Sequence, residues 1–115
     1  MKVVIAGSRD FDNYPLLCRE VDNILKDVKD IEIVSGTARG ADYYGECYAQ
    51  ERGYPLVKFP AMWTLYGRSA GYRRNEQMAL YADCVIVFWD GKSKGAEHMI
   101  KTAKAKGRAV HIIPF

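Results

Sequence analysis

Apolar residues along this chain gather into five short runs, separated by longer stretches of mixed character. The runs are rich in Val and Ile and do not alternate strictly between apolar and polar residues. Continuous apolar runs are typical of strands that are covered on both faces, as in a parallel sheet between two layers of helices. We therefore predict strands over residues 2–6, 31–35, 55–58, 84–88 and 109–113.

Between these runs, apolar residues recur at helical spacing. The first predicted helix follows a cap at Asp12 or Asn13, and Gly53 and Gly107 stand where glycine commonly ends a helix. Strands and helices that alternate and end in a fifth strand form an open, doubly wound α/β sheet, for which we expect the order 3-2-1-4-5 and one domain over residues 1–115. The apolar helix faces comprise Leu17, Val21, Ile24, Leu25 and Val28, then Ala41, Tyr44, Tyr48 and Ala49, then Met78, Tyr81 and Ala82, and finally Met99, Ile100 and Ala103.

Residues 59–71 show neither pattern. Long loops inside a compact domain are commonly binding loops or lids. With the order 3-2-1-4-5, the chain must travel from the edge strand back past strands 2 and 1 before it enters strand 4. We therefore expect a structureless loop over the ligand site, with Trp63 or Tyr66 available to stack on a base, and a helix that begins near Tyr72.

Three glycine-bearing turns each follow a predicted strand and precede a predicted helix. They span residues 7–9, 36–42 and 91–96 and follow strands 1, 2 and 4. Glycine lets the backbone approach a ligand closely, and a helix N-terminus attracts anions. Ligands of such sheets bind at the carboxyl edge where the strand order reverses, here between strands 1 and 4. The turns therefore predict one crevice for a phosphorylated small molecule.

Arginines, hydroxyls and carboxylates at this edge are the candidate ligand contacts. Arg9, Arg39 and Arg73 suit phosphate because a guanidinium donates two parallel hydrogen bonds and keeps its charge. One such arginine alone is better explained as a surface residue, but three beside glycine turns favour a site. Asp42 and Asp90 are placed to accept from ribose hydroxyls, although Asp42 also complements a helix dipole, and the hydroxyl residues are also common in turns and caps. The predicted ligand residues are Gly7, Ser8, Arg9, Ser35, Gly36, Thr37, Arg39, Gly40, Asp42, Arg73, Asn75, Asp90, Gly91, Ser93 and Gly95.

The sequence lacks the patterns that are typical of several other kinds of site. His98 and His111 have no partner at the spacing of a metal site or a Ser-His-Asp triad. The turn at Gly91 lacks the upstream glycine of a P-loop, and Gly7 does not begin a G-x-G-x-x-G fingerprint. We therefore expect no metal and no required cofactor, only a nucleotide-type ligand.

Composition and charge indicate the compartment and the kinds of partner that we expect for this protein. Three cysteines without C-x-x-C spacing fit a reducing cytoplasm, and no apolar run or N-terminal segment has the length of a membrane helix or signal peptide. A net charge of +3 is too small to indicate a nucleic-acid partner, and the C-terminal lysines are best explained as a solvated helix face. The sequence leaves both a monomer and a homo-oligomer open.

Six segments of the chain carry a resemblance to a known family: residues 7–9, 34–42, 67–71, 74–78, 82–83 and 88–95. They resemble the YspA-like, cpYpsA-related branch of the SLOG superfamily over essentially the whole chain. The resemblance implies a Rossmann-like, three-layer fold with helices on both faces of the sheet, and nucleotides or nucleotide-derived signals bound through the glycine turns. The superfamily also includes the LOG phosphoribohydrolases, which release cytokinins from their nucleotides, and the DNA-processing protein DprA.

The chain departs from its relatives at three positions. Thr37 replaces the second glycine of their G-G-A-R-G motif, and Ala96 replaces the threonine of a G-T pair. Met99 stands where LOG enzymes carry the glutamate that takes part in cleaving the N-glycosidic bond, and methionine is neither an acid nor a base. Glu97 is a poor substitute, because a side chain two positions earlier on a helix points in roughly the opposite direction.

These observations favour a binding module for a nucleotide or a nucleotide derivative, such as an ADP-ribose-like compound, that acts as a sensor or sequestering protein. The alternative is a hydrolase of a nucleotide N-glycosidic or phosphate bond, with Asp42, Asp90 or Glu97 as weak candidates for the general base. DprA-like binding of single-stranded nucleic acid through the basic C-terminal helix is the least favoured hypothesis.

Overall fold

Five parallel strands form one sheet in the order β3-β2-β1-β4-β5, which confirms the predicted order. The computed structural model describes residues 1–115. The central strand, β1, pairs with β2 on one side and with β4 on the other. Lys2 of β1 lies opposite Glu32 of β2, and Val3 of β1 lies opposite Cys84 of β4. The strands are β1 (Lys2–Gly7), β2 (Glu32–Ser35), β3 (Leu56–Lys58), β4 (Cys84–Trp89) and β5 (Ala109–Pro114).

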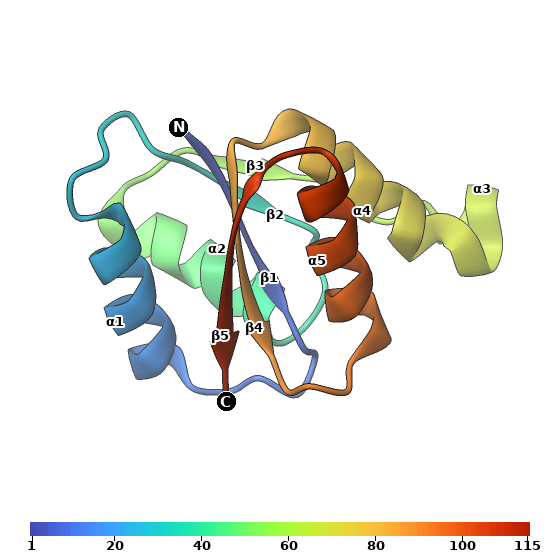
Figure 1. Cartoon of the computed structure of the whole chain (residues 1–115), viewed down its shortest axis with the longest axis horizontal. Helices are drawn as coiled ribbons and strands as arrows, with labels where there is room; N and C mark the ends of the chain where they lie inside the picture. Colours follow the sequence, from blue (N-terminus) through green and yellow to red (C-terminus); the bar gives the residue numbers. More distant parts are fainter.

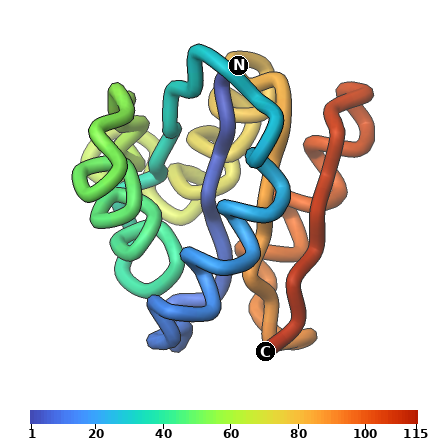
Figure 2. Tube along the Cα trace, turned by 90° about the vertical axis from the view of Figure 1, so that its left-hand side faces the viewer, coloured from blue at the N-terminus to red at the C-terminus, as the bar shows by residue number.

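Helices cover both faces of this sheet and complete a three-layer α/β, Rossmann-like fold (Figure 1). Helices α1 (Tyr14–Leu25) and α2 (Ala41–Arg52) lie on one side, and α4 (Ala70–Tyr81) and α5 (Lys94–Ala105) lie on the other. The turned view shows β1 between the flanking strands, with the C-terminal strand β5 along one edge of the sheet (Figure 2). None of the helices has the length and apolar character needed to cross a bilayer.

The two hydrophobic cores explain why the strands are continuously apolar. Val3 and Ile5 of β1 pack with buried residues of α1 and α2, whereas Val4 and Ala6 pack with buried residues of α4 and α5. Successive side chains of a strand point to opposite faces, so a strand covered on both sides needs apolar residues at every position.

The predicted helix ends agree with the structure. The side chain of Asn13 accepts a hydrogen bond of 3.1 Å from the backbone N–H of Leu16 and caps α1. Gly53 ends α2 in the left-handed conformation, where its N–H reaches the last carbonyls of the helix. These local signals position the helices that frame the carboxyl edge of the sheet.

The prediction of a structureless loop over residues 59–71 is wrong. The segment contains a single helical turn, α3 (Trp63–Tyr66), and a 3-10 turn, η1 (Gly67–Ser69), and α4 then begins at Ala70. The backbone amides of Leu65 and Tyr66 both donate to the carbonyl of Met62 and close the short helix. One turn is too short to produce a repeating apolar pattern, so periodicity does not detect it. Helix α3 projects from the body of the molecule beside the start of α4 (Figure 1).

Candidate functional site

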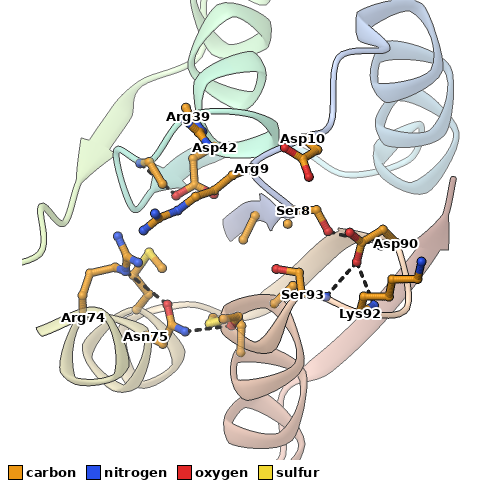
Figure 3. A pocket seen from close by; sticks show the side chains of 17 residues that line it. Ser8, Arg9, Asp10, Arg39, Asp42, Arg74, Asn75, Asp90, Lys92 and Ser93 are labelled. Atoms are coloured by element: carbon orange, nitrogen blue, oxygen red, sulfur yellow. Dashed lines mark hydrogen bonds between the residues drawn. The ribbon is translucent and has the colours of Figure 1, made fainter. Parts of the chain in front are cut away.

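A cavity of about 520 Å³ opens at the carboxyl edge of the sheet, beside the ends of β1 and β4. This is the point where the strand order reverses, and the volume lies within the roughly 300–1,000 Å³ of small-molecule sites. Its walls come from the turns after β1, β2 and β4, from residues 74–78 of α4 and from the N-terminal part of α5 (Figure 3).

The turn after β1 joins the other two turns through Ser8. Its N–H donates to the carbonyl of Phe88 at 2.9 Å, and its hydroxyl accepts from the N–H of Asp90 at 3.2 Å. Its carbonyl accepts from the N–H of Ala41, at the start of α2. A Cβ at Gly40, whose φ is +77°, would lie 2.4 Å from that carbonyl oxygen, so only glycine fits where these two turns meet.

The turn after β2 is held by Ser35, which is fully buried. Its hydroxyl donates to Oε2 of Glu46 at 2.7 Å and accepts from the N–H of Thr37 at 3.0 Å. Thr37 has a φ of +65°, a conformation that a β-branched residue rarely adopts. Ser35 thus holds the backbone in the conformation that presents Ala38, Arg39 and Asp42 to the cavity.

Asp42 is a carboxylate that lines the cavity and is only 4% exposed. Its Oδ2 accepts from the N–H of Ala38 at 3.2 Å. Burial raises its pKa to about 6, although the positive charges of Arg74 and Arg9 act in the opposite direction. Near neutral pH, Asp42 therefore changes its protonation state readily.

Arg74 reaches across the cavity from α4 toward the β2 turn. Its Nη1 donates to the carbonyl of Gly36 at 2.5 Å, and its Nε donates to Oδ1 of Asn75 at 3.1 Å. Burial lowers its pKa, and the nearby positive charge of Arg9 adds to this effect. Arg9 and Arg74 extend toward each other from opposite walls, so an anion between them would relieve their repulsion (Figure 3).

Asn75 connects α4 to the start of α5. Its Nδ2 donates to the carbonyl of Gly95 at 3.2 Å and lies 3.2 Å from Nδ1 of His98, whose Nε2 is 3.3 Å from the hydroxyl of Thr102. Burial lowers the pKa of His98, so the neutral ring accepts at Nδ1. Asn75 therefore fixes both Arg74 and the first turn of α5.

Asp90 shapes the turn between β4 and α5. Its Oδ1 accepts two backbone N–H groups at 2.8 Å, from Lys92 and Ser93, and these hydrogen bonds lower its pKa. The next turn begins α5, where Gly95 and Ala96 line the cavity. The N–H groups in the first turn of a helix have no acceptor within the helix, so they are available to an anion or a hydroxyl of a ligand.

Arg9 and Arg39 supply positive charge without an internal partner. Both side chains are exposed and line the cavity, and neither forms an ion pair within the protein. Together with Arg74, they place three guanidinium groups around one cavity. This arrangement suits a phosphate, which can accept hydrogen bonds from several guanidinium groups.

The cavity also has an apolar wall without a catalytic acid or base. Met99 is buried and lines this wall together with Met78. Glu97 lies outside the cavity lining and pairs with Lys101 at 3.1 Å. No group of three or more His, Cys, Asp or Glu residues is arranged to hold a metal ion.

The structure brings most of the predicted site residues together. Ser35, Gly40 and Gly91 do not line the cavity; they belong to the turns that form it. Gly36 and Thr37 line a smaller adjoining cavity. The predicted residues that do line the main cavity are Gly7, Ser8, Arg9, Arg39, Asp42, Asn75, Asp90, Ser93 and Gly95.

Arg73 requires a correction, because it does not line the cavity. It is exposed, donates from Nε to the hydroxyl of Ser69 at 3.1 Å, and has its guanidinium carbon 4.3 Å from the centre of the Tyr66 ring. Arg74 takes the place predicted for it. Helical spacing could have distinguished the two, since Arg74 lies one turn before the buried Met78. Sequence reasoning also missed Asp10 and Lys92 on the cavity wall.

Comparisons with known proteins agree with this architecture. The X-ray structure of DNA processing protein A (DprA) from Streptococcus pneumoniae matches with a TM-score of 0.76 at 21% identity, over 99% of this chain and 50% of that one. The chain thus spans half the length of that protein, and the likeness shows the fold alone. No curated protein sequence matches. A family model, YAcAr (YspA, cpYpsA-related SLOG family), matches residues 1–66, more than half of the chain. The chain therefore belongs to the YspA, cpYpsA-related SLOG family.

Proposed function

We propose that this protein binds a nucleotide or a nucleotide-derived small molecule, such as an ADP-ribose-like compound, as a sensor or sequestering module. The observation that carries the proposal is the pair of exposed arginines, Arg9 and Arg39, which line the cavity with no acidic partner. Membership of a SLOG family supports it, because this membership suggests a nucleotide-related ligand.

The chemistry of the walls fits the parts of such a ligand. The guanidinium groups of Arg9, Arg39 and Arg74 suit phosphate oxygens. The first turn of α5 offers backbone N–H groups, and the apolar wall at Met78 and Met99 suits the less polar face of a nucleoside. The ligand is therefore held by charge at one end of the cavity and by apolar contact at the other.

Arg39→Ala tests the proposal because this side chain has no structural partner to lose. We expect AMP, ADP or ADP-ribose to raise the melting temperature of the wild-type protein, since a ligand at about 100 times its Kd adds about 2.7 kcal/mol. The substitution should weaken binding at least about tenfold, the loss of one charge-assisted contact, while the unliganded melting temperature stays unchanged.

Arg73→Ala is the matched control, because Arg73 is an exposed arginine that lies outside the cavity. It should bind the same compounds with wild-type affinity in isothermal titration calorimetry. Equal losses in both variants would point to general surface charge instead of this site. A wild-type protein that none of the three compounds stabilises would contradict the proposal.

A hydrolase acting on the same class of ligand is the second candidate. Asp42 favours it, because a buried carboxylate with a pKa raised to about 6 is suited to general base catalysis. Asp90 is less suited, since its Oδ1 is committed to two backbone amides and its pKa is lowered. Adenine or adenosine released during hours of incubation with AMP, and absent with Asp42→Asn, would replace the binding proposal with this one.

A further inference from the structure

The main cavity continues past its arginines into two smaller cavities. One has a volume of about 410 Å³ and the other about 180 Å³. Arg9 and Arg74 line all three cavities, so these two side chains form the boundary between the main cavity and its extensions. Trp63 of α3 lines both extensions, which we call the Trp63 subsite.

The Trp63 subsite has the character of a stacking surface. Trp63 is 52% exposed, although a large aromatic ring is normally buried in a folded protein. Pro60 and Ala61 form an apolar border beside it, and Arg68 lines its smaller part. Stacking of a base on an aromatic side chain contributes about 1–3 kcal/mol and depends little on which base is present.

Positive charge is concentrated between the main cavity and the Trp63 subsite. Arg39 lines the main cavity and the larger extension, beside Arg9 and Arg74. A phosphate bridge at this position would receive hydrogen bonds from several guanidinium groups. A mononucleotide can fill the main cavity and reach the arginines, but it leaves the exposed ring of Trp63 uncovered.

We propose that the preferred ligand has two ring-bearing halves joined through phosphate, as in a dinucleotide. One nucleoside half occupies the main cavity, the phosphate bridge lies among Arg9, Arg39 and Arg74, and the second ring stacks on Trp63. This inference rests on the proposed function, and it adds that a second base contributes to affinity.

Two compounds isolate the second base. ADP-ribose and diadenosine diphosphate share an adenosine, a pyrophosphate and a second ribose, and they differ in the second adenine. In calorimetric titrations at one ionic strength, we expect diadenosine diphosphate to bind about tenfold more tightly than ADP-ribose, which corresponds to about 1.4 kcal/mol of stacking.

Trp63→Ala should remove this difference and leave the affinity for ADP-ribose unchanged, whereas Trp63→Phe should keep most of it. Leu65→Ala is the matched control, because Leu65 is an apolar residue of the same helical turn, is 67% exposed and borders neither extension. This variant should retain the full preference for diadenosine diphosphate.

The outcomes separate this inference from the proposed function. If ADP-ribose binds and the second adenine adds nothing, only this inference fails. Equal losses of both compounds in Trp63→Ala would also overturn it, because the tryptophan would then contact the shared half of the ligand. A 12-nucleotide single strand that binds more tightly than diadenosine diphosphate would replace it with a nucleic-acid partner. If neither compound binds, this inference fails, and the proposed function fails with it only when AMP and ADP also do not bind.

Discussion

Two regions that border the site are built in contrasting ways. The central turns, residues 7–10, 36–42 and 90–95, keep polar groups inside the protein, and Ser8, Asp42 and the neighbouring Ser35 are buried and hydrogen-bonded. The outer segment, residues 59–69, does the opposite. Its side chains at Met62, Trp63, Leu65 and Tyr66 are apolar or aromatic and exposed.

This difference separates rigid positioning from adaptable contact. A buried polar group with its hydrogen bonds made is costly to move, so the central turns hold their donors in place before a ligand arrives. An exposed aromatic ring gains stability when something covers it. The central turns thus suit recognition of a fixed group such as phosphate, whereas the outer segment suits a variable group such as a base.

Two glycines with positive φ angles, Gly40 and Gly67, provide the largest test of this contrast. Gly40→Ala in the central turns would place a Cβ 2.4 Å from the carbonyl oxygen of Ser8, whereas a Cβ at Gly67 in the outer segment would meet nothing within 4 Å. We expect Gly40→Ala to lower the free energy of unfolding by about 3 kcal/mol or more, from strain together with a clash. Gly67→Ala should cost only about 1–2 kcal/mol, from backbone strain alone.

Urea denaturation followed by circular dichroism measures both values. Equal costs in the two variants would mean that the turn after β2 can move away from Ser8, and the central turns would not be rigid. A large cost at Gly67 alone would reverse the comparison.

Asp42→Asn provides the next largest effect, through pH. The pKa of Asp42 is raised to about 6 in the folded protein, so the folded state holds this proton more tightly than the unfolded chain does. Its contribution to stability is therefore fully present below about pH 4 and is lost as the pH rises through about 6. The free energy of unfolding of Asp42→Asn, relative to that of the wild type, should therefore rise by up to about 3 kcal/mol between pH 4 and pH 7.5.

Chemical denaturation of both proteins over this pH range gives the difference directly. Asp10→Asn is the matched control, since Asp10 is an exposed carboxylate on the wall of the same cavity. A flat difference for Asp42→Asn would show that Arg74 and Arg9 offset the cost of burying the charge.

The same two regions show how far the sequence could predict the structure. The strands and the central turns were predictable because strands buried on both faces require apolar residues at every position, and glycine marks the turns that follow them. The edge where the turns meet then follows from the strand order. The outer segment was not predictable in this way, since one turn of helix gives no periodic signal and its apolar residues are not buried.

The misplaced arginine has a related physical cause. Arg73 and Arg74 are adjacent, and a displacement of one residue on a helix turns a side chain by about 100°. The four-residue spacing from Arg74 to the apolar Met78 was the local signal for the residue that faces the cavity. Asn75 and Met78 are buried in that packing, and Arg74 is shared between the carbonyl of Gly36 and the amide oxygen of Asn75. The contact of Arg74 with Gly36, by contrast, joins residues 38 positions apart and leaves no mark in the local sequence.

Thr37→Gly gives the smallest expected effect. It tests the one non-glycine residue of the central turns that has a positive φ. Thr37 is an exposed, β-branched residue with a φ of +65°, and it borders the larger part of the Trp63 subsite. Glycine adopts this backbone conformation without the strain of about 1–2 kcal/mol, but it loses about 0.5–1 kcal/mol through greater freedom in the unfolded chain. We therefore expect a net gain of about 0.5–1 kcal/mol in urea denaturation. Ala38→Gly is the control, because the φ of Ala38 is not positive, and this variant should lose about 0.5–1 kcal/mol in the free energy of unfolding. A loss of stability in Thr37→Gly would show that the threonine side chain stabilises the turn by more than its backbone strain costs.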